Sequence, residues 1–168
     1  MKINIICNIF DSTGYAAHAR QLANALHDRG CEVRIDSPKP ENWVRLVNDA
    51  ELLMLKRDFD EEYTSLMIGL PPYWRIGIAD NPARFIGYLV WEGDKIPKSW
   101  IKHIFHENVE QVWVPSNHVK EAILNTLKEI DSNEVYGKDI NKFIKVIPHG
   151  VDLNLFKPPE EKLERPFT

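Results

Sequence analysis

The sequence predicts an α/β fold: a doubly wound, mostly parallel Rossmann-like sheet with helices on both faces. Short apolar runs rich in Ile and Val alternate with amphipathic stretches of helical period. The apolar runs are nearly continuous, as in strands that are covered on both faces. The chain has 168 residues, 43% of them hydrophobic and 27% charged, with a formal net charge of −4. These values are ordinary for one globular domain and exclude a disordered or coiled-coil chain.

The first elements predict a strand–helix–strand unit. Residues 2–9 are dense in Ile and favour a strand, and the DSTG segment at 11–14 favours a turn. The helix that follows ends at Gly30, which takes a left-handed cap at little cost, and residues 31–36 form the second strand. A unit of about 35 residues predicts a right-handed crossover between parallel strands. The apolar face of the helix comprises Tyr15, Ala19, Leu22, Ala23 and Leu26.

The later elements follow the same alternation, although the pattern is weaker from residue 37 to residue 80. The strands are predicted at 65–72, ended by two prolines, and at 83–92, 111–115 and 143–148. Between the second and third of these strands lies a helix N-capped by Ser99, with Trp100, Ile101, Ile104 and Phe105 buried. A helix at 117–130, N-capped by Ser116, and a polar loop at 132–141 precede the last strand.

Cysteine usage and hydropathy indicate a cytoplasmic protein, either free or at the inner surface of the membrane. Cys7 and Cys31 are expected as reduced, buried thiols in neighbouring strands, because two cysteines make no disulfide framework or zinc spacing. The N-terminus lacks the long apolar region of a cleavable signal, and no run approaches the ~18–20 apolar residues of a membrane span. The small negative net charge predicts no nucleic-acid partner.

In doubly wound sheets, ligands bind outside the carboxyl ends of the strands. Gly14 opens the first helix, where free backbone N–H groups attract anions, and His18 lies one turn further on. A purely conformational role for Gly14 stays open, as does a plain surface position for His18. The glycine pattern is not GxGxxG, which argues against a dinucleotide-binding oxidoreductase.

The segment WEGDKIP at 91–97 places two carboxylates after a strand. Glu92 and Asp94 could act as an acid, a base or an acceptor for sugar hydroxyls, or they could cap and pair locally. His103 and His106 share a helix with the spacing of metal ligands, but the pattern is not HExxH, and we expect no metal.

Four segments, in order, resemble the N-terminal domain of GT-B-fold retaining glycosyltransferases of family four. The resemblance covers about residues 1–158, with 37–80 poorly constrained. The segments are TGYAAHARQLANALHDRGCEV at 13–33, GYLVWEGDKIPKSW at 87–100, VWVPSNHVKEAI at 112–123 and PHGVDLNLFKP at 148–158.

The resemblance implies metal-independent transfer of a sugar, with retention, from a UDP- or GDP-sugar to an acceptor, which is a sugar, a lipid-linked glycan or a small molecule. Glu92 stands where many relatives carry a histidine, and is the candidate catalytic residue. The implied cleft residues are Ser12, Thr13, Gly14, Tyr15, His18, Trp91, Asp94, Ser116 and Asn117, and the implied interdomain hinge comprises Pro148, His149, Gly150 and Asp152.

The resemblance also implies a division of the chain. Residues 1–157 would form the acceptor-side domain, and 158–168 a linker toward a C-terminal domain that binds the nucleotide sugar. We therefore expect no cofactor bound by this chain alone and no turnover without the second domain, supplied in cis or in trans. The alternative is a standalone binding module that pairs with a separate C-terminal subunit.

Overall fold

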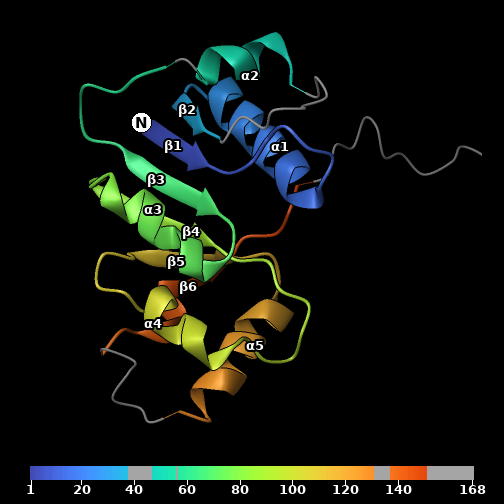
Figure 1. Ribbon diagram of the computed structural model, residues 1–168, viewed down its shortest axis with the longest axis vertical. Helices are drawn as coiled ribbons and strands as arrows, with labels where there is room; N and C mark the ends of the chain where they lie inside the picture. The colour runs from blue at the N-terminus through green and yellow to red at the C-terminus, as the bar shows by residue number, and fades with distance from the viewer. Residues whose placement is uncertain (38–46, 56, 131–136, 151–168) are drawn as a thin grey trace, which may run out of the picture.

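The centre of the molecule is a six-stranded sheet in the order β2-β1-β3-β4-β5-β6, and all its pairings are parallel. The computed structural model describes residues 1–37, 47–55, 57–130 and 137–150. The predicted doubly wound, parallel α/β fold is therefore confirmed (Figure 1). The strands are β1 (Lys2–Ile6), β2 (Glu32–Asp36), β3 (Thr64–Ile68), β4 (Arg84–Tyr88), β5 (Gln111–Val114) and β6 (Ile144–Val146).

Helices cover both faces of the sheet. The helices are α1 (Gly14–Asp28), α2 (Asp49–Met54), α3 (Trp74–Ala79), α4 (Ile101–Ile104), α5 (Asn117–Leu127) and α6 (Ile140–Phe143), with the 3-10 turns η1 (Pro71–Tyr73) and η2 (Lys98–Trp100).

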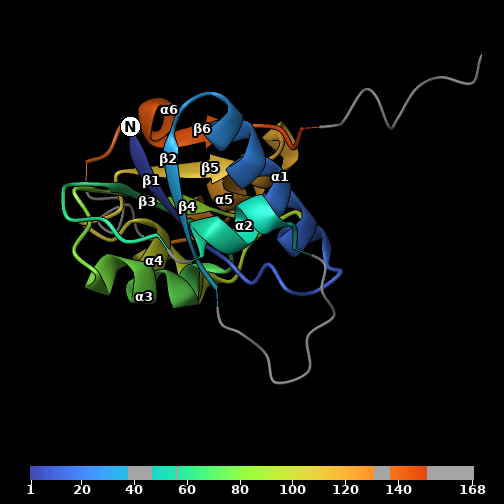
Figure 2. The same ribbon diagram turned by 90° about the horizontal axis from the view of Figure 1, so that it is seen from above.

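Alternate residues of the strands enter two separate hydrophobic cores. Ile5 and Leu66 belong to the core beneath α1 and α2, whereas Ile6 and Met67 belong to the core beneath α3, α4 and α5. Figure 1 shows α1 and α2 beside β1 and β2, away from α4 and α5, and Figure 2 shows α1 and α3 on opposite sides of the strands. Burial on both faces explains why the strands read as continuous apolar runs.

The first strand–helix–strand unit forms, although the strand predicted at 2–9 ends at Ile6. The Thr13 hydroxyl caps α1 by accepting from the backbone N–H of Ala16. At the other end, Gly30 has φ +82°, its N–H donates to the His27 carbonyl, and the Cys31 N–H donates to the Leu26 carbonyl. This pair of bonds is a Schellman motif, which ends the helix and turns the chain into β2.

Several other predicted boundaries are wrong. The helix predicted at 117–130 ends at Leu127, and the strand predicted at 143–148 is limited to Ile144–Val146. The strand predicted at 65–72 ends at Ile68, because the two prolines begin η1 and the short helix α3 follows. The strand predicted at 83–92 ends at Tyr88, after which the chain leaves the ladder. Ser99 is not an N-cap: it lies inside η2, and α4 has no side-chain cap. Ile101, Ile104 and Phe105 are buried as expected, whereas Trp100 is only partly buried.

Two predictions fall wholly or partly outside the described residues. These are the domain boundary at 157–158 with the linker 158–168, and the first part of the polar loop 132–141. The end of that loop begins α6 at Ile140.

The strand order places a topological switch point between β1 and β3. From β1 the chain first moves outward to β2 and then returns past β1 to continue through β3, β4, β5 and β6. Such a reversal leaves a crevice at the carboxyl ends of the two strands, where ligands of doubly wound proteins bind. The loops that follow β1, β3, β4, β5 and β6 all lie at this carboxyl edge.

Candidate functional site

The loop after β1 is held by a network of its own. The Asn8 amide donates to the Asp11 carboxylate at 2.6 Å, and the Thr13 N–H donates to the same carboxylate at 2.9 Å. Hydrogen bonds from the Thr13 side chain and backbone lower the pKa of Asp11. The Arg20 guanidinium, one and a half turns along α1, donates to the carbonyls of Ile9 and Asp11. The loop therefore presents a fixed backbone at the start of α1.

Tyr15 joins the start of α1 to the end of β4. Its side chain is half-buried, and its hydroxyl donates to the Val90 carbonyl at 3.0 Å. Burial raises the pKa of Tyr15, and the negative charge of Glu92 raises it further. The phenol is therefore neutral at physiological pH, and Glu92 lies close enough to act on it electrostatically.

Glu92 itself is exposed and lies at a corner formed by the loop after β4 and the first turns of α1 and α5. The ring Nε2 of His118, in the first turn of α5, lies 3.1 Å from the Glu92 carbonyl. Tyr15 approaches from the other side through Val90. The chain after β4 is thus held from both sides, and the Glu92 carboxylate points toward solvent rather than into a salt bridge of the described residues.

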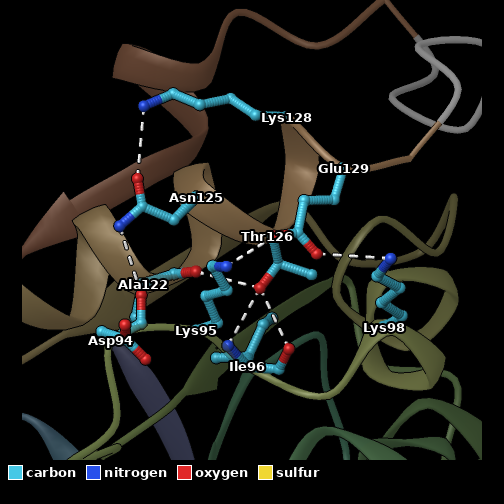
Figure 3. Close-up of polar contacts among 9 residues, drawn as sticks. All are labelled: Asp94, Lys95, Ile96, Lys98, Ala122, Asn125, Thr126, Lys128 and Glu129. Atoms are coloured by element: carbon cyan, nitrogen blue, oxygen red, sulfur yellow. Dashed lines mark hydrogen bonds and ion pairs between the residues drawn. The ribbon is translucent and has the colours of Figure 1, made fainter.

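A buried threonine fastens the same loop to α5 (Figure 3). Thr126 is 1% exposed, and its hydroxyl oxygen accepts from the Ile96 N–H at 2.9 Å and lies 3.0 Å from the Ile96 carbonyl. Next to it, the Asn125 amide donates to the Asp94 carbonyl at 3.2 Å. Lys95 pairs with Glu129, whose pKa is lowered by this hydrogen bond. The loop that carries Glu92 is therefore rigidly positioned.

Trp91 has a structural role in this arrangement. Its indole N–H donates to the Lys95 carbonyl at 2.8 Å and its ring meets Trp100 edge-on, with centroids 4.9 Å apart. The indole closes the turn 91–95 and shields the core beneath it. Asp94 is exposed in the same turn, and its carboxylate is available to a ligand.

His18 is not on the surface. It is 9% exposed and stacks on His149, with ring centroids 4.1 Å apart, and its ring meets that of Tyr88 at a tilt, with centroids 4.9 Å apart. The Tyr88 hydroxyl donates to the Ile147 carbonyl at 2.7 Å, so the predicted hinge segment is anchored to α1 and β4. Burial lowers the pKa of His18 to about 4 and, less strongly, lowers the pKa of His149.

A groove of about 470 Å³ runs beside this stack. It follows α1 from His18 to Asp28, and Tyr88, Ile147 and Pro148 form its other wall. The buried Nε2 of His18 has no hydrogen-bond partner among the described residues.

The remaining predicted residues have mixed outcomes. Ser116 caps α5, its hydroxyl accepting from the Val119 N–H at 3.4 Å, as predicted. Gly14 and Gly150 are exposed; neither adopts positive φ, and an added Cβ would meet nothing within 4 Å, so packing requires a glycine at neither position. Asp152 lies outside the described residues. Of the other predicted site residues, Ser12, Asn117 and Pro148 are exposed.

Among the described residues, no group of three or more His, Cys, Asp and Glu side chains could hold a metal ion. His106 is exposed, and its Nδ1 accepts from the backbone N–H of Asn108 at 3.2 Å. Within the same part of the chain, no helix has the length and apolar character that a membrane crossing needs.

Four functional candidates were missed in the sequence: Tyr88, His118, Thr126 and Arg20. Tyr88 lies within an apolar strand, and the other three read as ordinary polar positions of amphipathic helices. Their roles depend on contacts across more than nine residues of sequence, for which one sequence contains no signal.

The fold and the candidate site at the carboxyl edge of the sheet therefore rest on the geometry of this chain alone. Comparison with protein-family models, with curated proteins and with solved structures found no match.

Proposed function

We propose that this chain is the acceptor-side domain of a retaining glycosyltransferase, with the corner formed by Tyr15, Glu92 and His118 as its acceptor wall. The observation that supports this most strongly is that the first turns of α1 and α5 both contact the loop after β4, which carries the exposed Glu92, and that the Glu92 charge acts on Tyr15. A carboxylate with no salt-bridge partner among the described residues can accept a hydrogen bond from a sugar hydroxyl and assist its deprotonation.

The rigidity of the corner supports the same assignment. A group that orients an acceptor must be held to within a fraction of an ångström, and the Thr126 and Tyr15 contacts fix the loop at two points. The resemblance to family-four enzymes supplies the reaction type and the donor class, a UDP- or GDP-sugar. In this proposal a second domain, in cis or in trans, binds the donor, and the reaction takes place between the two.

The alternative, a binding module that pairs with a separate subunit, is favoured by one observation. The groove beside the His18–His149 stack lies where the chain passes toward residue 151, and it provides an open surface for a partner. Association of the purified chain with a separate donor-binding subunit, and the appearance of transfer on mixing, would support this alternative.

The experiment is sugar transfer from radiolabelled UDP- and GDP-sugars by the complete two-domain enzyme carrying Glu92→Gln. We expect kcat to fall by at least about 100-fold, the scale of general acid–base catalysis. Glu107→Gln, an exposed carboxylate at the opposite edge of the sheet, is the control. Wild-type rates in the Glu92 variant would refute a catalytic role for this residue.

A further inference from the structure

A second cavity lies at the topological switch point. It has a volume of about 520 Å³ and opens at the carboxyl ends of β1 and β3. Its floor consists of the last residues of these strands with the residues that follow them, and its third wall consists of Tyr73 and Ile76. This volume is within the range of small-molecule sites, roughly 300–1,000 Å³.

The lining of this cavity is mostly apolar and carries no charged side chain. The Asn8 side chain is engaged on both sides, since its amide donates to Asp11 and its oxygen accepts from the Phe10 N–H. The Cys7 thiol contacts the Asn8 carbonyl at 3.4 Å, and burial raises its pKa to about 12. The remaining polar side-chain group is the phenol hydroxyl of Tyr73, a residue that is 57% exposed, so the cavity offers few groups to compensate the desolvation of hydroxyl or phosphate groups.

Two exposed apolar side chains mark the rim. Tyr73 is 57% exposed and Ile76 is 56% exposed, which is unusual for residues of this size that flank an apolar cavity. Large apolar groups left open to water around a hollow indicate a binding surface for an apolar ligand.

The cavity and the corner proposed as the acceptor wall lie at the same carboxyl edge of the sheet. The Gly69 N–H in the floor of the cavity donates at 3.1 Å to the carbonyl of Tyr88, on the strand that leads to Glu92. On the other side, the Cys7 Sγ lies 3.9 Å from the Tyr15 carbonyl. A ligand whose hydroxyl lies at Glu92 could therefore place an apolar group toward β1 and β3.

We infer that the acceptor is a small molecule with an uncharged aryl or short alkyl group, which occupies the cavity between β1, β3 and α3. This inference rests on the proposed function and names the class of its acceptor. The hydroxyl that receives the sugar lies at the Glu92 corner, and the apolar group supplies affinity.

The test compares two ligands that differ only in the apolar group, 2-naphthyl β-glucoside and methyl β-glucoside. Binding to the chain is measured by calorimetry and by methyl NMR of labelled Ile and Met residues. We expect the naphthyl compound to bind at least about tenfold more tightly, since it buries an aromatic group. Its binding should shift the methyl signals of Ile6, Met67 and Ile76.

Variants then locate the effect. Ile76→Lys puts a charge at the rim of the cavity without disturbing the core, and should abolish the preference for the naphthyl compound. The control is Leu53→Lys, at an exposed apolar position on α2, which should leave this preference intact. Equal affinity for the two glucosides, absence of naphthyl binding, or a preference that survives Ile76→Lys would each overturn the inference. So would Ile76-dependent binding to phosphatidylcholine vesicles without a naphthyl preference, which would assign the rim to a membrane surface. None of these outcomes changes the transfer assay of the Glu92 variant, so the two proposals fail separately.

Discussion

Replacing His18 with phenylalanine should remove a large part of the pH dependence of stability. The variant keeps an aromatic ring between Tyr88 and His149 but cannot take up a proton. In the folded chain the pKa of His18 is lowered from 6.5 to about 4, mainly because burial disfavours the charged ring, and His149 adds to the effect.

The sign follows from which state binds the proton. Below pH 6.5 the unfolded chain protonates His18 while the folded chain keeps it neutral until about pH 4, so stability is lost as the pH falls through this interval. At about 1.4 kcal/mol per pH unit, the interval from 6.5 to 4 corresponds to about 3.5 kcal/mol. At pH 4 the folded ring is itself half protonated, so about 3 kcal/mol of this is lost by that pH. The lowered pKa of His149 acts in the same direction.

Urea denaturation of wild type and His18→Phe at intervals between pH 7 and pH 4 measures this difference. The free energy of unfolding of the variant, relative to wild type, should rise by about 3 kcal/mol over the range. His27→Phe, at an exposed position on the same helix, removes a histidine without touching the stack and should show no such rise. Parallel pH profiles for wild type and His18→Phe would refute the reasoning.

Two further predictions concern single buried contacts. Thr126→Val keeps the shape of the side chain but leaves the Ile96 N–H without its partner. It should lower the free energy of unfolding by about 1–3 kcal/mol and speed hydrogen exchange of the 92–98 loop. Thr126→Ser, which keeps the hydroxyl, should leave both the stability and the exchange rate close to wild type. Gly87→Ala would drive a Cβ into the buried Trp74 ring, and thermal denaturation should show a loss of about 1–3 kcal/mol or more. At Gly69, where a Cβ meets nothing within 4 Å, the same substitution should be nearly neutral.

The sheet was predictable from sequence because its determinants are local. The Ile-rich run of β1, the capped amphipathic helix α1 and the left-handed Gly30 each act within a few residues, and together they predict parallel strands. The strand order, with β1 between β2 and β3, depends on packing between distant segments, and one sequence contains no signal for it.

The errors have the same origin. The prolines after β3 were read as the end of a strand, but their fixed φ also suits the first turn of a helix, and the burial of Trp74 against Gly87 selects that outcome. Ser99 has the residue type of an N-cap, yet the turn η2 begins one residue earlier, at Lys98.

The candidate site was only partly predictable. Glu92 is predicted because it lies at a strand end, which places it at the carboxyl edge by topology alone. Tyr15 is a site candidate only through the family resemblance, since the helical period predicts it on the apolar face of the first helix. Three other features come from contacts that the residue types do not reveal. These are the turn closed by Trp91, the burial of His18 against His149, and the hydrogen bond between Thr126 and Ile96. A residue type alone does not distinguish a ligand-binding side chain from one that holds a loop.

The central claim is that the Glu92 corner binds the acceptor, and a site-resolved titration tests it most directly. The ¹⁵N-labelled chain is titrated with the naphthyl glucoside or another acceptor, and backbone amide shifts are recorded for wild type and Glu92→Gln. The account predicts shifts at Tyr15, Gly93 and His118 that are strongly reduced in the variant. Saturable binding that moves only amides along the groove between α1 and residues 147–150, and is unaffected by Glu92→Gln, would contradict it.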